Sequence, residues 1–261
     1  MIYRKETYKQ LIRKSYGFDQ EKQNMSLAWK IMDSLYQKNY LQAIDTTEKI
    51  PKKIHQIWLG DKQMPEIYLK YMESWKKFHP TWEYKLWTDE DTKSIEILKR
   101  ETFDNAQNQG MRSDILRYEI LRQFGGMYVD TDFECLRAFD DLLYLDFITG
   151  IGYDSKLQLY IGLLASVPNH CIMNKSINLS APFYTGQKGS RIMNVTGVNH
   201  FTKCFLSCVT KETKGVVAFP MDFFYPFPNN MRRQANPYKY INACSYAIHH
   251  WGISWSKKGL K

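Results

Sequence analysis

The sequence predicts an α/β fold, in which helices flank a mostly parallel central sheet. Strand-like and helix-like segments alternate along residues 54–132, and this βαβ pattern is typical of parallel sheets. The chain of 261 residues is 44% hydrophobic and 15% aromatic, which indicates a globular protein with a sizeable core. This length suits one large domain that carries an appendage.

Residues 1–48 are expected to form an N-terminal helical extension, and residues 49–261 the main domain. Apolar residues recur at helical spacing from Leu11 to Leu41, and Gly17 would separate a first helix from a second. The extension either packs on the main domain or binds an acceptor or a membrane face. Packing is the simpler interpretation.

A strand, a helix and a second strand open the main domain. Residues 54–60 are hydrophobic and β-prone up to a glycine turn, and residues 82–87 alternate as a half-buried strand does. Between them, residues 65–78 carry an apolar stripe at helical spacing. The acidic residues at 89–91 suit the N-terminus of a following helix, which explains them without a catalytic role.

The central motif of the chain lies at residues 110–132 and combines a helix, a Gly-Gly turn, a short strand and two carboxylates. Ser113 is a good N-cap for the helix, and Gly125 supplies the conformation that ends it. The next residues are aromatic and β-branched, as in a short strand. Asp130 and Asp132 then stand where this strand ends.

The rest of the chain continues the alternation. Thr196 is expected to cap the helix that follows it. The expected later elements are strands at 147–153 and 157–164, a helix at 172–177, a helix at 198–209, a strand at 216–219, an irregular wall at 221–230 and a strand that ends near 249.

Charge and cysteine content restrict the class of protein. The net charge of +9 favours phosphate-bearing ligands or an anionic membrane, but no basic block resembles a nucleic-acid arm, so no nucleic acid is expected as a partner. Five cysteines without framework spacing suggest reduced thiols in a cytoplasm. Residues 1–14 are polar and basic, and no apolar run reaches membrane-spanning length, so neither a signal peptide nor a transmembrane helix is expected.

Two strand ends carry the candidate ligand-binding residues. The first strand ends at Trp58, and the central motif ends at Asp130 and Asp132. Ligands of open parallel sheets gather at the carboxyl ends of the strands, so we expect these residues on one rim. Paired carboxylates repel each other unless a cation neutralises them, and a divalent metal that carries a phosphate would do so. An Asp-x-Asp alone is common in loops; its combination with the helix and the Gly-Gly turn is more specific.

The run Ser113-Asp114-Ile-Leu-Arg117 through Gly125-Gly126-x-Tyr128-x-Asp130-x-Asp132 resembles the sugar-binding region and DXD motif of glycosyltransferase family 32. That family includes bacterial capsular-polysaccharide transferases and fungal mannosyltransferases. More distantly, the run is similar to the glucosylating domain of the large clostridial toxins. The resemblance implies a Rossmann-like fold of the GT-A type, in a bacterial enzyme of capsule or exopolysaccharide biosynthesis.

The resemblance also implies roles for individual residues. Asp114, Arg117, Asp130 and Asp132 correspond to the catalytic set, in which Asp114 binds sugar hydroxyls. Arg117 would contact sugar hydroxyls or offset the carboxylates. Asp130 and Asp132 would hold Mn²⁺ or Mg²⁺.

Residues outside the central motif complete the expected site. The stretch from Tyr246 to Trp255 also resembles the family's closing segment, which implies that a histidine here joins the metal or phosphate contacts. Neighbouring strand residues face opposite ways, so only one of the two should do so, and we expect His249, with His250 as the alternative. The resemblance further implies contacts to the nucleotide sugar, besides those of Asp114, Arg117 and Asp130, from Ile57, Trp58, Thr131, Ser254 and Trp255. Trp58 would stack on the base.

The expected activity is a metal-dependent, retaining transfer of a hexose from a UDP- or GDP-linked donor to a hydroxyl of a glycan or lipid-linked acceptor. The alternatives are a nucleotide-sugar hydrolase, a protein-glycosylating effector that uses the same site, and, more distantly, a nucleic-acid-binding protein. We expect a cytoplasmic protein with a peripheral contact at the anionic inner membrane face.

Overall fold

The computed structural model describes residues 26–44, 46–106, 108–152, 157–180, 192–233 and 236–252. The helix expected before Gly17 lies outside these residues, as do Ser254 and Trp255. For them the expectations from the sequence stand as predictions.

Among the described residues, six strands form the central sheet in the order β2-β1-β3-β6-β5-β7. The strands are β1 (Lys53–Ile57), β2 (Glu83–Trp87), β3 (Gly126–Val129), β5 (Phe147–Ile151), β6 (Leu159–Ser166) and β7 (Val216–Phe219). β1 pairs in parallel with β2 and β3, and β5 with β7, whereas β6 runs antiparallel to both of its neighbours. Five of the six strands therefore point the same way, and the predicted mostly parallel α/β sheet is confirmed.

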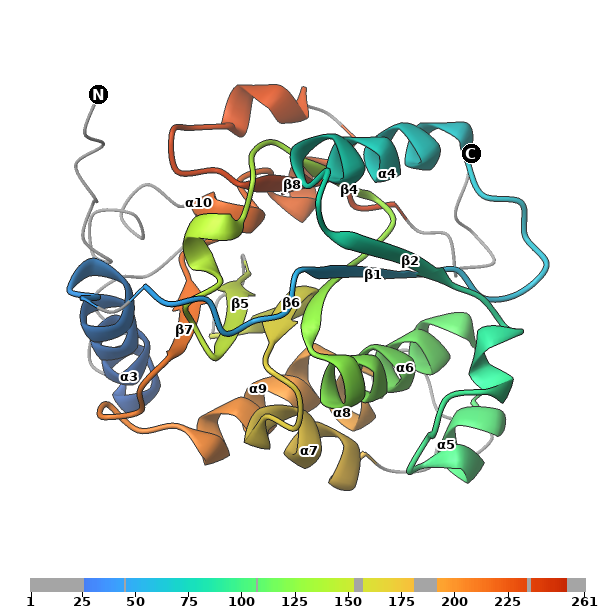
Figure 1. Cartoon of the computed structure of the whole chain (residues 1–261), viewed down its shortest axis with the longest axis horizontal. Helices are drawn as coiled ribbons and strands as arrows, with labels where there is room; N and C mark the ends of the chain where they lie inside the picture. The colour runs from blue at the N-terminus through green and yellow to red at the C-terminus, as the bar shows by residue number, and fades with distance from the viewer. Residues whose placement is uncertain are drawn as a thin grey trace.

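Helices cover both faces of this sheet (Figure 1). α6, α7 and α9 lie on one side, and α4 lies on the other, next to β4 and β8. The helices are α3 (Leu27–Tyr36), α4 (Glu66–Phe78), α5 (Arg100–Asp104), α6 (Gln109–Phe124), α7 (Cys171–Asn178), α8 (Ile192–Val195), α9 (Val198–Cys208) and α10 (Met221–Phe224). A π-helical turn, η1 (Gln37–Leu41), continues α3, and short 3-10 turns lie at η2 (Asp91–Lys93), η3 (Asp140–Leu142), η5 (Asn229–Met231) and η6 (Pro237–Tyr240).

A small second sheet joins two distant parts of the chain. β4 (Phe133–Cys135) pairs antiparallel with β8 (Ala247–His249), and Phe133 lies opposite His249 in the register. The strand expected to end near residue 249 is therefore present, and its partner begins one residue after Asp132.

The described helix of the N-terminal extension packs on the main domain. α3 lies beside β7 (Figure 1), and its buried residues Trp29, Met32 and Leu35 belong to the same hydrophobic cluster as the sheet. This supports the packing interpretation for the helix. A domain boundary at residue 48 stays a prediction.

Two predicted helix caps are wrong. α6 begins earlier than expected, and the side chain of Asn108 accepts the amide of Met111 as its N-cap, so Ser113 lies inside the helix. Thr196 does not cap α9, where Gly197 holds the N-cap position. The Thr196 hydroxyl instead donates to Asp114, because a buried carboxylate is a stronger acceptor that only the folded chain brings near.

The Gly-Gly turn after α6 is held by a buried histidine on β1. Gly125 and Gly126 both have positive φ, of 60° and 88°, as a turn between helix and strand requires here. The indole N–H of Trp87 donates to His55 Nδ1, so Nε2 carries the proton and donates to the carbonyl of Gly125, 3.0 Å away. Burial lowers the pKa of His55 to about 4, so the ring stays neutral.

Among the described residues, no helix combines the length and hydropathy that crossing a membrane would require.

Candidate functional site

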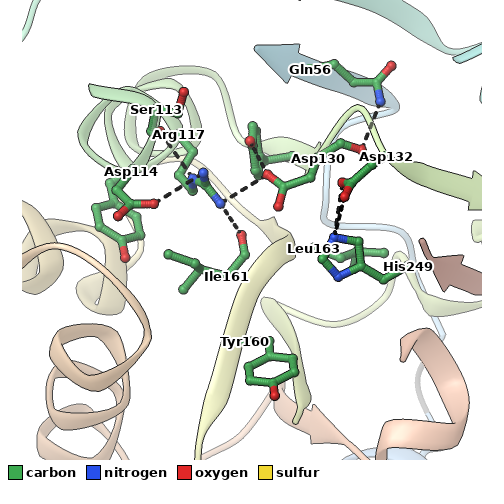
Figure 2. Close-up of polar contacts among 12 residues, drawn as sticks. Gln56, Ser113, Asp114, Arg117, Asp130, Asp132, Tyr160, Ile161, Leu163 and His249 are labelled. Atoms are coloured by element: carbon green, nitrogen blue, oxygen red, sulfur yellow. Dashed lines mark hydrogen bonds and ion pairs between the residues drawn. The ribbon is translucent and has the colours of Figure 1, made fainter. Parts of the chain in front are cut away.

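Three potential metal ligands meet at the rim of the central sheet. Asp130, Asp132 and His249 each offer one ligand atom, and these atoms lie within 4.8 Å of one another. In the described part of the chain, this is the one group of three or more such residues placed closely enough to share an ion. Figure 2 shows Asp130 and Asp132, which come from the loop between β3 and β4, together with His249 from β8.

The sheet topology explains why these residues meet. β1 and β3 are parallel neighbours, so Trp58 and Asp130, which follow them, emerge at the same rim, as the sequence predicted. Asp130 is fixed by its amide, which donates to Gly162 on β6, and by its carbonyl, which accepts from the Gln56 side chain. The pairing of β4 with β8 then brings His249 back to Asp132.

His249 is held against Asp132 by a rigid aromatic environment. Its Nε2 lies 3.0 Å from both carboxylate oxygens of Asp132. Its ring stacks on Phe133 at 4.3 Å between centroids, and the ring of Trp251 lies 4.0 Å away on a tilted plane. Nδ1 is buried and finds no hydrogen-bond partner among the described residues. The His249 imidazole therefore has an unused nitrogen and is suited to contact a group that binds at this site.

Asp132 is also held by the backbone of the closing segment. The amide of Gly252 donates to Asp132 Oδ2 at 2.7 Å, and the amide of His250 donates to its carbonyl. The His250 side chain points elsewhere, because its Nε2 lies 3.0 Å from Glu134 and its ring stacks flat on Tyr71. The structure thus brings His249, rather than His250, to the carboxylate pair.

Arg117 bridges the two halves of the site. Its guanidinium lies 3.2 Å from both Asp114 and Asp130, and it also donates to the carbonyl of Ile161 at 2.9 Å (Figure 2). The residue is only 5% exposed. Of the two roles expected for Arg117, this geometry supports the offset of the carboxylates, and the pair is a buried bridge rather than a surface ion pair.

Asp114 is a buried carboxylate with two partners, Arg117 and the hydroxyl of Thr196 at 3.0 Å. Burial raises its pKa to about 6, although Arg117 and Thr196 both act in the opposite direction. Such a group is close to half protonated in mildly acidic solution.

Asp130 stands between a positive charge and a second carboxylate. Burial, opposed by Arg117 and reinforced by Asp132, raises the pKa of its carboxyl. The Tyr128 hydroxyl donates to Asp130 Oδ1 at 2.5 Å, and the Arg117 guanidinium lies over the Tyr128 ring. A Cβ on Gly162 would stand 2.8 Å from Asp130 Oδ2, so the absence of a side chain there makes room for the carboxylate.

The side expected to bind the base lies on the same rim as the candidate metal ligands. Ile57 ends β1 and is buried, and Trp58 follows it half-buried at the rim. The Trp58 indole N–H donates to the carbonyl of Lys62, which fixes the ring. Thr131 is buried between the two aspartates of the motif.

Sequence reasoning missed several residues that contact this site. Tyr128 had a signal, because it precedes Asp130 by two positions and therefore shares its face of the strand. Thr196 was recognised as polar but assigned to a cap. Gly252 and Tyr68 had no local signal, since the tertiary fold alone brings them to Asp132.

Residues 65–147 match the family model described as the glycosyltransferase sugar-binding region containing the DXD motif. This segment includes Asp114, Arg117, Asp130 and Asp132.

Similar proteins include two fungal enzymes. The mannosyl phosphorylinositol ceramide synthase SUR1 of Saccharomyces cerevisiae is 34% identical over 173 residues, which are 63% of this chain and 43% of that protein. The inositol phosphoceramide mannosyltransferase 3 of Schizosaccharomyces pombe is 37% identical over 99 residues, or 36% of this chain and 28% of that protein. The chain thus spans less than half the length of these two relatives.

Among solved structures, the PaToxG glycosyltransferase matches 68% of this chain and 74% of its own at 20% identity, with a TM-score of 0.47. The family match and the fungal relatives give the central motif one consistent interpretation. Residues 65–147 thus resemble the sugar-binding region of the DXD-motif glycosyltransferases, and the resemblance predicted from the sequence is confirmed.

Proposed function

We propose that the protein is a metal-dependent, retaining glycosyltransferase that moves a hexose from a nucleoside-diphosphate sugar to a hydroxyl acceptor. The observation that carries this proposal is the convergence of Asp130, Asp132 and His249 on the rim where Trp58 also emerges. The match of residues 65–147 to a sugar-binding region supports the same activity. Retention of anomeric configuration rests on the family resemblance.

The charges of the site fit a divalent cation. Asp114, Asp130 and Asp132 bring three carboxylates, and Arg117 brings one cation, so two negative charges are left when His249 is neutral. Asp130, Asp132 and His249 would hold the ion, which would act as a Lewis acid for the departing diphosphate. Two carboxylate oxygens with one imidazole nitrogen suit Mn²⁺ better than Mg²⁺, because Mg²⁺ prefers oxygen ligands throughout.

The other side chains have separable tasks in this proposal. The Trp58 ring offers a face on which the base stacks. Asp114 accepts hydrogen bonds from sugar hydroxyls, and Arg117 holds Asp114 and Asp130 at a fixed separation while it offsets their charge. Side chains that hold the reactants in a fixed orientation lower the activation barrier of the transfer.

The named relatives suggest which substrates to test first. Their names describe mannosyl transfer to inositol phosphoceramide. We therefore propose GDP-mannose as the first donor and an inositol-phosphate lipid as the first acceptor, with UDP-hexoses and glycans as the alternatives. A place in capsule or exopolysaccharide biosynthesis, and a bacterial source, stay predictions.

A thermal-shift screen tests the proposal most directly. The protein is heated with GDP-mannose, GDP-glucose, UDP-glucose or UDP-N-acetylglucosamine, each with Mn²⁺. A ligand at 100 times its Kd should stabilise the fold by about 2.7 kcal/mol, and the best one identifies base and sugar together. If no nucleotide sugar raises the melting temperature with Mn²⁺ present, the proposal is wrong.

A product assay separates transfer from hydrolysis. Donor consumption is followed with and without the inositol-phosphate lipid, and the anomeric configuration of the product is determined by NMR. A transferase should turn over faster with acceptor and give a product that retains the donor configuration. Free sugar as the main product in both reactions would support the nucleotide-sugar hydrolase instead.

A further inference from the structure

Tyr68 links the two sides of the site but has no role in the function proposed above. It lies on α4 and is 5% exposed. Its ring meets the Trp58 ring edge-on, with the centroids 6.0 Å apart. Its hydroxyl reaches Gly252, where a Cβ would stand only 1.7 Å from the oxygen. Because the amide of Gly252 donates to Asp132, Tyr68 spans the distance from the base side to the metal-ligating residues.

The Tyr68 hydroxyl has a donor that the described residues leave unused. It makes no hydrogen bond within the part of the chain that the structure describes. Burial, reinforced by the charge of Asp132, raises the pKa of this phenol well above its ordinary value. The group therefore keeps its proton at every pH of interest and acts as a neutral donor.

The position of Tyr68 indicates which part of the ligand it would meet. A nucleotide that stacks its base on Trp58 and places its phosphates near Asp132 must cross the space beside Tyr68. The nearby carboxylates repel phosphate oxygens, whereas a phenol O–H attracts them without adding a charge.

We propose that the Tyr68 hydroxyl donates a hydrogen bond to a phosphate oxygen of the nucleoside-diphosphate donor. Tyr68 is then a donor-binding residue that sets the distance between base and diphosphate. This inference rests on the proposed function and deepens it. The purely structural alternative is that Tyr68 only fills the space beside Gly252, in which case its ring matters and its hydroxyl does not.

The substitution Tyr68→Phe separates these roles, because it keeps the ring contacts with Trp58 and removes one oxygen. Isothermal titration with preformed Mn²⁺ complexes of GDP, UDP and inorganic pyrophosphate gives the Kd of each probe. We expect Tyr68→Phe to raise the Kd of the preferred nucleotide by roughly 10- to 100-fold, the factor that a hydrogen bond to a charged group provides. Pyrophosphate, which lacks base and ribose, should lose a similar factor.

Tyr71→Phe is the matched control. Tyr71 lies one helical turn further along α4, and its ring stacks on Tyr68 and on His250. We expect Tyr71→Phe to bind the preferred nucleotide and pyrophosphate with the same Kd as the wild type. Melting temperatures of both variants report whether the fold is kept.

The possible results distinguish the inference from the proposed function. If the wild type binds a nucleotide and Tyr68→Phe binds it equally well, the inference is wrong and the glycosyltransferase proposal stands. The inference is also wrong if Tyr68→Phe weakens the nucleotide but not pyrophosphate, because the contact then goes to the ribose. If the wild type binds neither nucleotide with Mn²⁺, both proposals fail together.

Discussion

At the level of single residues, the site holds buried charges that are coupled, because each charged side chain influences the protonation of its neighbours. Arg117 contacts both Asp114 and Asp130. Burial and the charge of Asp132 raise the pKa of Asp130. Removing one partner of such a set leaves an uncompensated buried charge, which costs more than the pair contributes. Single substitutions here should therefore affect ligand binding and stability in ways that can be separated.

Asp132→Ala should abolish transfer while the fold is kept. Asp132 is the residue that His249 and the Gly252 amide both contact, so its loss removes the centre of the proposed metal site. Loss of Lewis-acid stabilisation, worth several kcal/mol, corresponds to a decrease in turnover of more than about 100-fold. Donor turnover at saturating Mn²⁺ and circular dichroism measure the two effects.

Asp104→Asn is a suitable control for this substitution, because Asp104 is an exposed carboxylate on α5 paired with Arg100. It should leave turnover unchanged. Full activity of Asp132→Ala in the presence of a chelator would falsify the metal model.

Asp114→Asn should change how stability depends on pH. The folded pKa of Asp114, about 6, lies above its ordinary value of 3.8, so the folded state binds this proton more tightly. The contribution of Asp114 to stability is therefore fully present below pH 3.8 and is lost as pH rises through 6. Relative to the variant, the wild type should lose on the order of 3 kcal/mol across this range.

The measurement for Asp114 is the free energy of unfolding from urea titrations at several pH values between 4 and 7.5. The difference between wild type and Asp114→Asn is compared at each pH, which removes the contributions of titrating groups that do not interact with Asp114. A difference that stays constant with pH would show that Asp114 does not have a raised pKa.

At the level of elements, strand β6 sets the room available to the carboxylates of the loop after β3. The Gly162 carbonyl on β6 accepts a hydrogen bond from the Asp130 amide, and the lack of a side chain on Gly162 leaves space for the Asp130 carboxylate. β6 is also the one antiparallel strand of the described central sheet, and its Ile161 carbonyl binds Arg117. One strand thus positions both the DXD loop and the arginine that offsets it.

Gly162→Ala should lower the affinity for Mn²⁺ and nucleotide more than it lowers stability. The added methyl group would stand 2.8 Å from Asp130 Oδ2 and 3.0 Å from the Phe133 ring, so the carboxylate must move. Overpacking of this kind costs about 1–3 kcal/mol. Titration with Mn²⁺-nucleotide and urea unfolding give the two quantities.

Gly150→Ala on β5 provides a comparison, because its methyl group would meet the rings of Tyr225 and Phe224 instead of a carboxylate. It should reduce stability by a similar amount with a smaller effect on binding. Equal losses of affinity in both variants would mean that Gly162 acts only through general packing.

At the level of the whole molecule, the charge of +9 suggests where the protein works. We propose a cytoplasmic location with peripheral contact to the anionic membrane face, which agrees with a lipid acceptor but rests on charge and composition. Juxtamembrane basic residues contribute about 1 kcal/mol each near such a surface, and salt weakens that attraction.

Vesicle co-sedimentation tests this proposal. The protein should bind vesicles that contain phosphatidylserine at low ionic strength, and binding should fall severalfold on addition of 0.5 M salt. Vesicles of phosphatidylcholine alone are the control. Equal binding to both vesicle types, unaffected by salt, would contradict an electrostatic contact.

Much of the site could be predicted because its signals are local. Short spacings separate Asp114 from Arg117 and Asp130 from Asp132. Helix and strand periodicity therefore predict that the two members of each pair lie close together. Strand alternation predicted that only one of His249 and His250 enters the site, and the structure places His249, the favoured one, at Asp132. The cap at Thr196 was predicted wrongly, because a local rule cannot weigh a buried acceptor that arrives from residue 114.

The sequence by itself determined the alternation of strands and helices over residues 54–132 and the rim on which the candidate ligands lie, since hydrophobic periodicity and the βαβ pattern constrain both. Only the tertiary structure decided what completes the site. Tyr68 from α4, Thr196 before α9 and Gly252 after β8 reach the aspartates from far along the chain. Such contacts depend on how the elements pack, and local sequence patterns do not encode that packing.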